Sequence, residues 1–281
     1  MTENDPRTIV ITGASDGIGA AAARTLASAG HRVVIVGRSA AKTQAVATAA
    51  GITDVHLADF TRLDDVQRLA GELRDSYPRI DVLANTAGGI FDGPDRTRDG
   101  FEKTFQVNHL APFLLTHGVI DRLVDSRALV VNTASIAARM FSKLDLDDLN
   151  TWDHFTPNRA YGNAKLAGIL FARGLTTHYA ARGLTAISFH PGVVSTNFAS
   201  DTTSPLRWVY QTVMKAFLVT SEQGGENLRR FLDPTNRERW RSGTYYDPAG
   251  RQSRTTPVAG DLHVIEEHWR RSSAMLGLTW P

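Results

Sequence analysis

The chain of 281 residues has 42% hydrophobic and 21% charged residues, which is typical of a soluble globular protein with a well-buried core. Its net charge of +2 is too small to indicate a nucleic-acid partner, and the absence of cysteine excludes disulfides and thiolate chemistry. The polar N-terminus is unlike a signal peptide and no apolar run could span a bilayer, so we expect a cytoplasmic protein with no membrane partner.

Short, β-branched apolar runs alternate with longer helical patterns along most of the chain. We expect strands at 8–12, 32–36, 54–58, 80–84, 128–132 and 184–190, and helices at about 18–29, 40–49, 62–76, 98–123 and 159–181. A helix near 221–232, a short strand at 243–246 and a helix near 260–276 complete the pattern. The alternation predicts an α/β fold: one domain over 1–281, with a doubly wound parallel sheet of about seven strands and helices on both faces.

The segment 198–219 is less regular and combines serine, threonine and proline with aromatic residues. Its aromatic side chains could pack in the core, or the segment could close over a substrate as a lid. The lid interpretation predicts a bulky, largely apolar substrate.

A glycine-rich loop, 12-TGASDGIGA-20, follows the first predicted strand and leads into a helix. Gly13, Gly17 and Gly19 permit a tight turn and let a pyrophosphate approach the main chain at the helix N-terminus, where N–H groups and the helix dipole favour an anion. A plain strand–helix turn is the alternative, but the position after the first strand meets the condition for a dinucleotide site.

The end of the second predicted strand indicates which dinucleotide binds. An acidic residue there would bind the ribose 2′-hydroxyl of NAD, whereas Arg38 can pair with the 2′-phosphate of NADP. Asp16 opposes this choice by charge repulsion, and Arg38 could simply be solvated while Ser39 caps the next helix. We predict NADP(H) in preference to NAD(H).

Tyr161 and Lys165 lie four positions apart in the helical run 159-RAYGNAKLAG-168, so they share one helix face. Free tyrosine has a pKa of about 10, and a neighbouring ammonium favours the phenolate. The pair could therefore act as an acid–base device. The same spacing also occurs by chance on amphipathic helices, so the interpretation depends on the rest of the chain.

Several motifs in order make the chain resemble the short-chain dehydrogenase/reductases, a Rossmann-fold family, and most of all their retinol dehydrogenase and WW-domain oxidoreductase-like branch. The resemblance covers nearly the whole chain. Besides the glycine loop and the Tyr–Lys pair, it rests on Asp59, 85-NTAG-88, Asn108 in 105-FQVNHLAPFLLT-116, Ser135 in 131-VNTASIAAR-139, and 190-HPGVVST-196. The chain departs from the family at Thr86 and Ala134, where asparagine and serine are usual, but neither change removes a catalytic group.

The resemblance implies hydride transfer between NADP(H) and an alcohol/carbonyl pair. It implies that Tyr161 is the general acid–base and that Lys165 favours the phenolate and holds the nicotinamide ribose. Ser135 would donate a hydrogen bond to the substrate oxygen, and Asn108 would bend its helix and anchor a water that links Lys165 to solvent. The cofactor contacts implied are Gly13, Ser15, Asp16, Gly17, Ile18, Gly19, Arg38, Asp59, Phe60, Asn85, Ala87, Gly88, Tyr161, Lys165, Pro191, Gly192, Val194 and Thr196.

Two other functions are compatible with this family. One is reduction of an activated carbon–carbon double bond, which uses the same Tyr and Lys, and the other is non-catalytic NADP(H) sensing, in which one of them is usually lost. No histidines have metal-ligand spacing, so no metal site is predicted. The family commonly forms a homodimer or homotetramer through the helices that include the catalytic one, and the apolar positions of 166-LAGILFARGL-175 could serve such an interface or the core.

Overall fold

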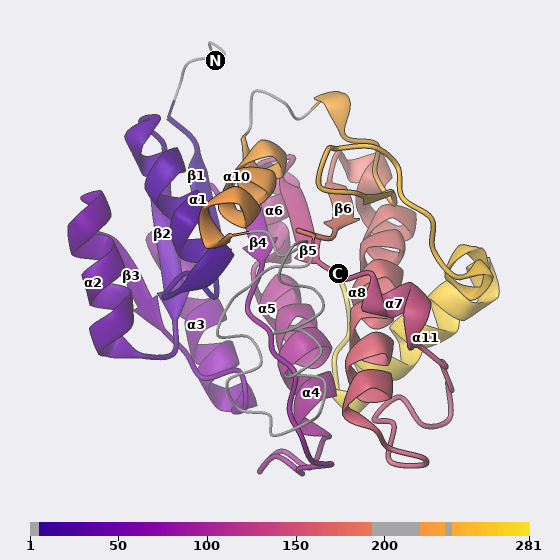
Figure 1. Ribbon diagram of the computed structural model, residues 1–281. Coiled ribbons are helices and arrows are strands. Elements are labelled where there is room, and N and C mark those ends of the chain that lie inside the picture. Colours follow the sequence, from indigo (N-terminus) through magenta and orange to yellow (C-terminus); the bar gives the residue numbers. More distant parts are fainter. Residues whose placement is uncertain (1–5, 193–219, 234–237) are drawn as a thin grey trace.

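The computed structural model describes residues 6–192, 220–233 and 238–281 (Figure 1). Within these residues a seven-stranded sheet has the order β3-β2-β1-β4-β5-β6-β7, and every neighbouring pair is parallel. The strands are β1 Thr8–Thr12, β2 Arg32–Gly37, β3 Asp54–Leu57, β4 Val82–Asn85, β5 Leu129–Thr133, β6 Thr185–Phe189 and β7 Tyr245–Tyr246. The predicted parallel α/β fold is confirmed.

Helices cover both faces of the sheet (Figure 1). One face carries α1 Gly17–Ser28, α2 Ala40–Ala50 and α10 Ser221–Leu232, and the other carries α3 Leu63–Ser76, α5 Ala111–Gly118 and α8 Pro157–Tyr179. Successive strand side chains point to opposite layers, so Ile9 and Ile11 pack with the first set and Val10 packs with the second. Burial on both faces explains why the strands are continuously apolar.

The remaining helical elements are short, apart from the last. They are α4 Lys103–Phe105, the π-turn η1 Gln106–Leu110, α6 Ile120–Asp125, α7 Ala137–Met140, η2 Ala180–Arg182, η6 Pro257–Gly260 and α11 Leu262–Met275. No helix in the described ranges is both long and apolar enough to cross a membrane.

The helix predicted over 98–123 differs from the structure in a way that matters for the site. It begins at Lys103, widens into the π-turn at Gln106–Leu110, and is divided again between α5 and α6. In the π-turn the Ala111 N–H bonds the Gln106 carbonyl five residues back. The Asn108 side chain donates to the Thr104 carbonyl, four residues back, at 2.8 Å, and so joins the π-turn to α4.

The C-terminal helix α11 packs along α8 (Figure 1). Trp269 lies over Gly174, where an added Cβ would stand 2.5 Å from the indole ring. Trp280 stacks on Trp269 at 4.4 Å between ring centroids and meets Phe113 of α5 at 5.0 Å. The apolar positions of 166–175 therefore face the core or α11, so among the described residues they serve packing within the chain.

Candidate active site

Most of the predicted site residues follow the carboxyl ends of strands, which meet at one edge of the parallel sheet, whereas Asn108 lies on the π-turn and Tyr161 and Lys165 lie on α8. Strand β1 pairs with β2 on one side and β4 on the other, so the chain changes its winding direction between β1 and β4. In open parallel sheets a ligand binds at such a switch point.

The glycine loop after β1 is packed directly against the loop after β4. Gly13 has a φ of +69°, and a Cβ there would stand 2.8 Å from the main chain of Ala87. A Cβ on Gly19 would stand 2.5 Å from the Gly13 carbonyl oxygen. Thr12, which the sequence analysis did not single out, joins the two loops because its Oγ1 accepts the N–H groups of Thr86 at 3.0 Å and Ala87 at 3.1 Å. Only glycine fits this cradle at the N-terminus of α1, as a bound pyrophosphate requires.

The residues expected to select the nucleotide lie at the rim of this cradle. Arg38 is exposed after β2 and makes no hydrogen bond or ion pair with any residue that the structure describes. Asp16 caps α1 by accepting the Gly17 N–H at 2.7 Å, and its other oxygen lies 3.5 Å from Nζ of Lys42 on α2. Lys42 was missed because 26 residues separate it from Asp16. The Lys42 ammonium offsets the negative charge of Asp16, which was expected to repel the 2′-phosphate of NADP(H).

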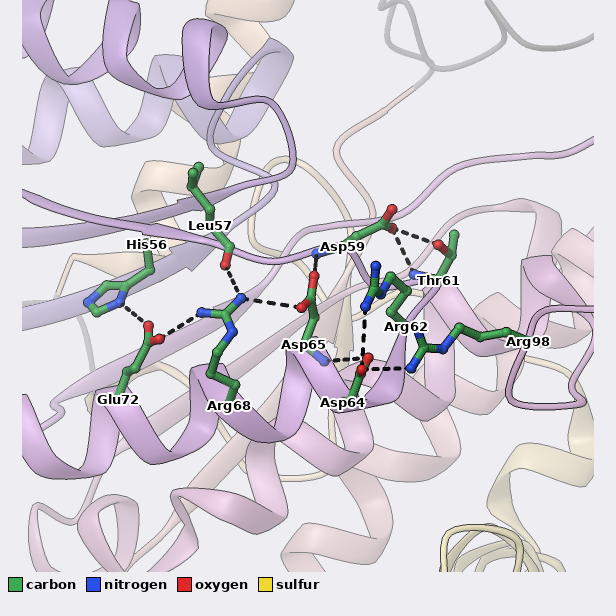
Figure 2. A network of polar contacts seen from close by, with 10 residues as sticks. All are labelled: His56, Leu57, Asp59, Thr61, Arg62, Asp64, Asp65, Arg68, Glu72 and Arg98. Atoms are coloured by element: carbon green, nitrogen blue, oxygen red, sulfur yellow. Dashed lines mark hydrogen bonds and ion pairs between the residues drawn. The ribbon is translucent and has the colours of Figure 1, made fainter.

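Asp59, expected at the adenine, is held by a local polar network after β3 (Figure 2). Its Oδ1 accepts the N–H and the hydroxyl of Thr61 at 2.9 and 2.8 Å, and its N–H donates to Asp65 at 3.1 Å. This bond to Asp65 ties α3 to the loop, and Arg68, also on α3, pairs with Asp65 and donates to the Leu57 carbonyl at the end of β3 at 2.8 Å. Oδ2 of Asp59 has no partner among the described residues and can accept a ligand N–H, whereas the neighbouring Phe60 is buried in the core.

Asn85 is buried and its side chain points into the protein interior. Its amide donates to Asn132 of β5 at 2.9 Å and to Thr116 of α5 at 3.3 Å. Asn132 donates onward to the Gly168 carbonyl of α8 at 3.1 Å. The side chain of Asn85 therefore ties the sheet to α8 through Asn132, which leaves the main chain of Asn85 as the group that could contact a cofactor.

Asn108 and Lys165 are brought together beside Gly88. The Asn108 amide donates to the Gly89 carbonyl at 2.7 Å, and its Oδ1 accepts the Gly89 N–H at 3.2 Å. A Cβ on Gly88 would stand 2.4 Å from Oδ1 of Asn108 and 3.2 Å from Nζ of Lys165. A side chain at position 88 would therefore push the two groups apart.

Lys165 extends from α8 beneath the ring of Tyr161, as the four-residue spacing predicts. Its Nζ lies 5.5 Å from the Tyr161 ring centroid and donates to the Thr133 carbonyl at 2.9 Å. The side chain is 4% exposed, and burial lowers the pKa of its amine to about 7. Lys165 can therefore exchange a proton near neutral pH.

Ser135 follows the Thr133 anchor by two residues. Its Oγ accepts the Ala137 N–H at 3.2 Å, which leaves the hydroxyl hydrogen free to be donated to a substrate. The segment between Ser135 and Tyr161 is called the insert below. Its first part lies against α8 next to Tyr161, because a Cβ on Gly162 would stand 2.8 Å from the Ser142 nitrogen. Asn163 secures this contact by accepting the Lys143 N–H at 2.7 Å.

The last strand-end motif is described only in part. The Pro191 carbonyl accepts a bond from Asn227 of α10 at 3.2 Å, and Gly192 follows it. The predicted contacts Val194 and Thr196, and the lid segment 198–219, lie outside the described residues.

Comparison with known proteins decides the family. A family model for short chain dehydrogenases matches residues 7–206. The chain belongs to the short-chain dehydrogenase family. This short-chain dehydrogenase is 36% identical over 282 residues to a protein from Streptomyces sp. (strain C5) named for daunorubicin C-13 ketoreductase activity, with 97% of this chain and 93% of the relative covered. It is 32% identical over 286 residues to human retinol dehydrogenase 12, with 98% and 87% covered.

A solved structure supports the same placement. An uncharacterised protein from Mycobacterium paratuberculosis superposes on this short-chain dehydrogenase with a TM-score of 0.75 and 29% identity, and 100% of this chain and 99% of that chain are covered. The predicted family and its retinol dehydrogenase-like branch are confirmed, and the chain is an oxidoreductase with an NAD(P)-binding fold.

Proposed function

We propose that the protein transfers a hydride between NADP(H) and the alcohol/carbonyl pair of a hydrophobic small molecule. The observation that carries the proposal is that Asn108 and Lys165 meet beside Gly88, with the Tyr161 ring next to Lys165, at the sheet edge that also holds the glycine cradle. The complete set of acid–base groups favours an enzyme over a non-catalytic NADP(H) sensor.

The cofactor would be held by main-chain and charged groups of this chain. The cradle of Gly13 and Gly19 at the N-terminus of α1 would bind the pyrophosphate, Arg38 the 2′-phosphate, and Asp59 the adenine. When bound, NADP(H) supplies or accepts the hydride.

Proton transfer falls to the chain itself. In the reduction direction the Tyr161 hydroxyl gives its proton to the carbonyl oxygen, and Ser135 donates a hydrogen bond to the same oxygen as negative charge develops. The Lys165 ammonium stabilises the phenolate that remains. Its pKa of about 7 suits it to relaying a proton to Tyr161, and a water at Asn108 would link Lys165 to solvent and restore that proton.

Cofactor preference is the first test of this proposal. NADPH should bind at least about tenfold more tightly than NADH, because Arg38 can make charge-assisted contacts with the 2′-phosphate while Lys42 offsets Asp16. Arg38→Asp should reverse the order, and Lys42→Ala should weaken NADPH binding while sparing NADH. Calorimetric titration of each variant with both cofactors provides the measurement.

Arg74→Asp is the matched control, since it makes the same charge change on an exposed arginine in the last turn of α3. It should leave the preference for NADPH intact. Equal affinity of the parent protein for the two cofactors would exclude the assignment of NADP(H).

The substrate class is suggested by the names of the relatives, which refer to daunorubicin and retinol; both are bulky, and retinol is largely apolar. We expect the catalytic efficiency, kcat/KM, on 2-alkanones to rise severalfold per added carbon until the pocket is full, because burial contributes about 0.8 kcal/mol per methylene. The rate of reduction of each ketone is measured by the decrease in NADPH absorbance, and daunorubicin and retinal are tested as further substrates. A flat or falling series would contradict an apolar pocket.

Product analysis with an α,β-unsaturated ketone distinguishes carbonyl reduction from double-bond reduction, since a double-bond reductase would yield the saturated ketone instead of the alcohol.

A homodimer or homotetramer remains a proposal. Because α11 covers α8, subunits would have to pair through another surface.

A further inference from the structure

Two buried histidines connect the π-turn that carries Asn108 to the C-terminal helix. His109 is 1% exposed, and its Nε2 lies 2.9 Å from the hydroxyl of Ser272 on α11. His268, one turn earlier on α11, is also 1% exposed, and its ring centroid lies 4.7 Å from that of His109. Neither imidazole takes part in the proposed chemistry.

His109 contacts the chain on both sides of the π-turn as well as α11. Its ring centroid lies 5.1 Å from that of Phe105, before the turn, and 5.6 Å from that of Phe113, after it. Burial lowers the pKa of both histidines, that of His268 to about 3, so both rings are neutral at physiological pH. A π-turn is a rare backbone form that needs support from its surroundings, and this packed neutral ring supplies it.

A second route joins α11 to the same region. Arg271 donates to the Leu146 carbonyl and to the Asp147 carboxylate of the insert, both at 2.7 Å. Asn150, farther along the insert, accepts the Glu102 N–H at 2.9 Å at the start of α4. The C-terminal helix therefore supports both the entry to the π-turn and the turn itself.

On its other side, the π-turn is held to the loop after β4. Asn108 makes two hydrogen bonds with Gly89, and its Oδ1 occupies the space that a Cβ on Gly88 would need. A movement of the turn away from α11 would therefore change the position of Asn108 relative to Gly89.

We propose that His109 is a positioning residue, which fixes Asn108 against Gly89 by anchoring the π-turn to Ser272 of the C-terminal helix. Only the catalytic consequence rests on the proposed function; the anchoring itself does not. The Gly89 N–H gives a direct report, because it donates to Asn108 and does not contact His109.

The test uses His109→Phe, Ser272→Ala and the double variant. His109→Phe retains a stacked ring but leaves the buried Ser272 hydroxyl without its partner, so the melting temperature should fall; the double variant removes both partners and should recover it. Hydrogen exchange at the Gly89 amide, measured without cofactor or substrate, should nevertheless be at least about tenfold faster than in the parent in all three variants, since the Asn108 bond opens more often.

Activity provides the second measurement. With 2-decanone and NADPH, kcat of the double variant should fall by about tenfold and its solvent deuterium isotope effect should rise, because proton return at Asn108 slows, while the KM for NADPH stays unchanged. Ser242→Ala is the control, because it removes a hydroxyl bond to Thr176 on α8, 2.7 Å long, together with the bond from the Ala186 N–H at 3.0 Å. It should alter neither Gly89 exchange nor kcat.

Parental exchange at Gly89 in the double variant, or recovery of kcat together with the melting temperature, would overturn the positioning role. If His109→Phe does not fold, Ser272→Ala alone decides in the same way. Loss of the proposed oxidoreductase activity would be recognised separately, because a parent protein that is inactive on every carbonyl would still show the exchange result.

Discussion

Tyr161→Phe should lower kcat for carbonyl reduction by at least about a hundredfold while leaving NADPH affinity within about twofold of the parent value. The change removes one hydroxyl and keeps the ring that lies beside Lys165, whose bond to the Thr133 carbonyl is independent of Tyr161. The carbonyl oxygen then gains negative charge with no positioned proton donor. Steady-state NADPH absorbance gives the rate, and calorimetric titration gives the affinity.

Tyr245→Phe is the control for this experiment. Tyr245 is a buried tyrosine of β7, and its hydroxyl has no hydrogen-bond partner among the described residues. Removal of the Tyr245 hydroxyl should leave kcat for carbonyl reduction unchanged. If Tyr161→Phe turns over a substrate of the parent at the parental rate, Tyr161 is not the acid.

Lys165→Met should abolish turnover and at the same time stabilise the fold, by on the order of 2–4 kcal/mol at pH 7. Burial lowers the pKa of Lys165 from 10.5 to about 7, so unfolding at neutral pH is accompanied by proton uptake. The resulting penalty on the folded state is complete below pH 7 and disappears as the pH rises from 7 to 10.5. Methionine retains a long apolar stem but leaves the Thr133 carbonyl without its donor, which reduces the gain.

Urea unfolding of the parent and Lys165→Met at pH 7 and pH 10 measures this effect. The stability difference should shrink at pH 10, because the folded-state amine is then neutral and the unfolded-state amine is close to its own pKa of 10.5, so most of the penalty is gone. Lys143→Met, at an exposed lysine, should show no such trend. A Lys165→Met variant that is less stable than the parent at pH 7 would contradict the inferred cost of burying this amine.

The elements that the sequence predicted well are those whose signal is local. Strand β1 with its glycine loop, and Tyr161 with Lys165 on one helix face, depend on residues within a few positions of each other. The π-turn at Gln106–Leu110 was not predictable in this way, because one extra residue in a helical turn leaves the apolar spacing on either side almost unchanged.

Contacts between residues far apart in the sequence were also not predicted. Lys42 with Asp16 and His109 with Ser272 are joined only by the tertiary fold, and no spacing rule relates them. Asn85 illustrates a further limit. Its motif predicts a contact with the cofactor. The side chain instead points into the interior toward Asn132, and this direction depends on the register of β4 against β5.

Lys165 and Asn108 share one kind of anchor, because their hydrogen-bond partners among the described residues are main-chain groups of Thr133, Gly89 and Thr104. Main-chain carbonyls and N–H groups are present whatever the side chain. Evolution can therefore exchange the side chains at these three positions without losing the anchors. Redesign of the enzyme for a new substrate can begin in the insert between Ser135 and Tyr161, with the proton-transfer groups kept as they are.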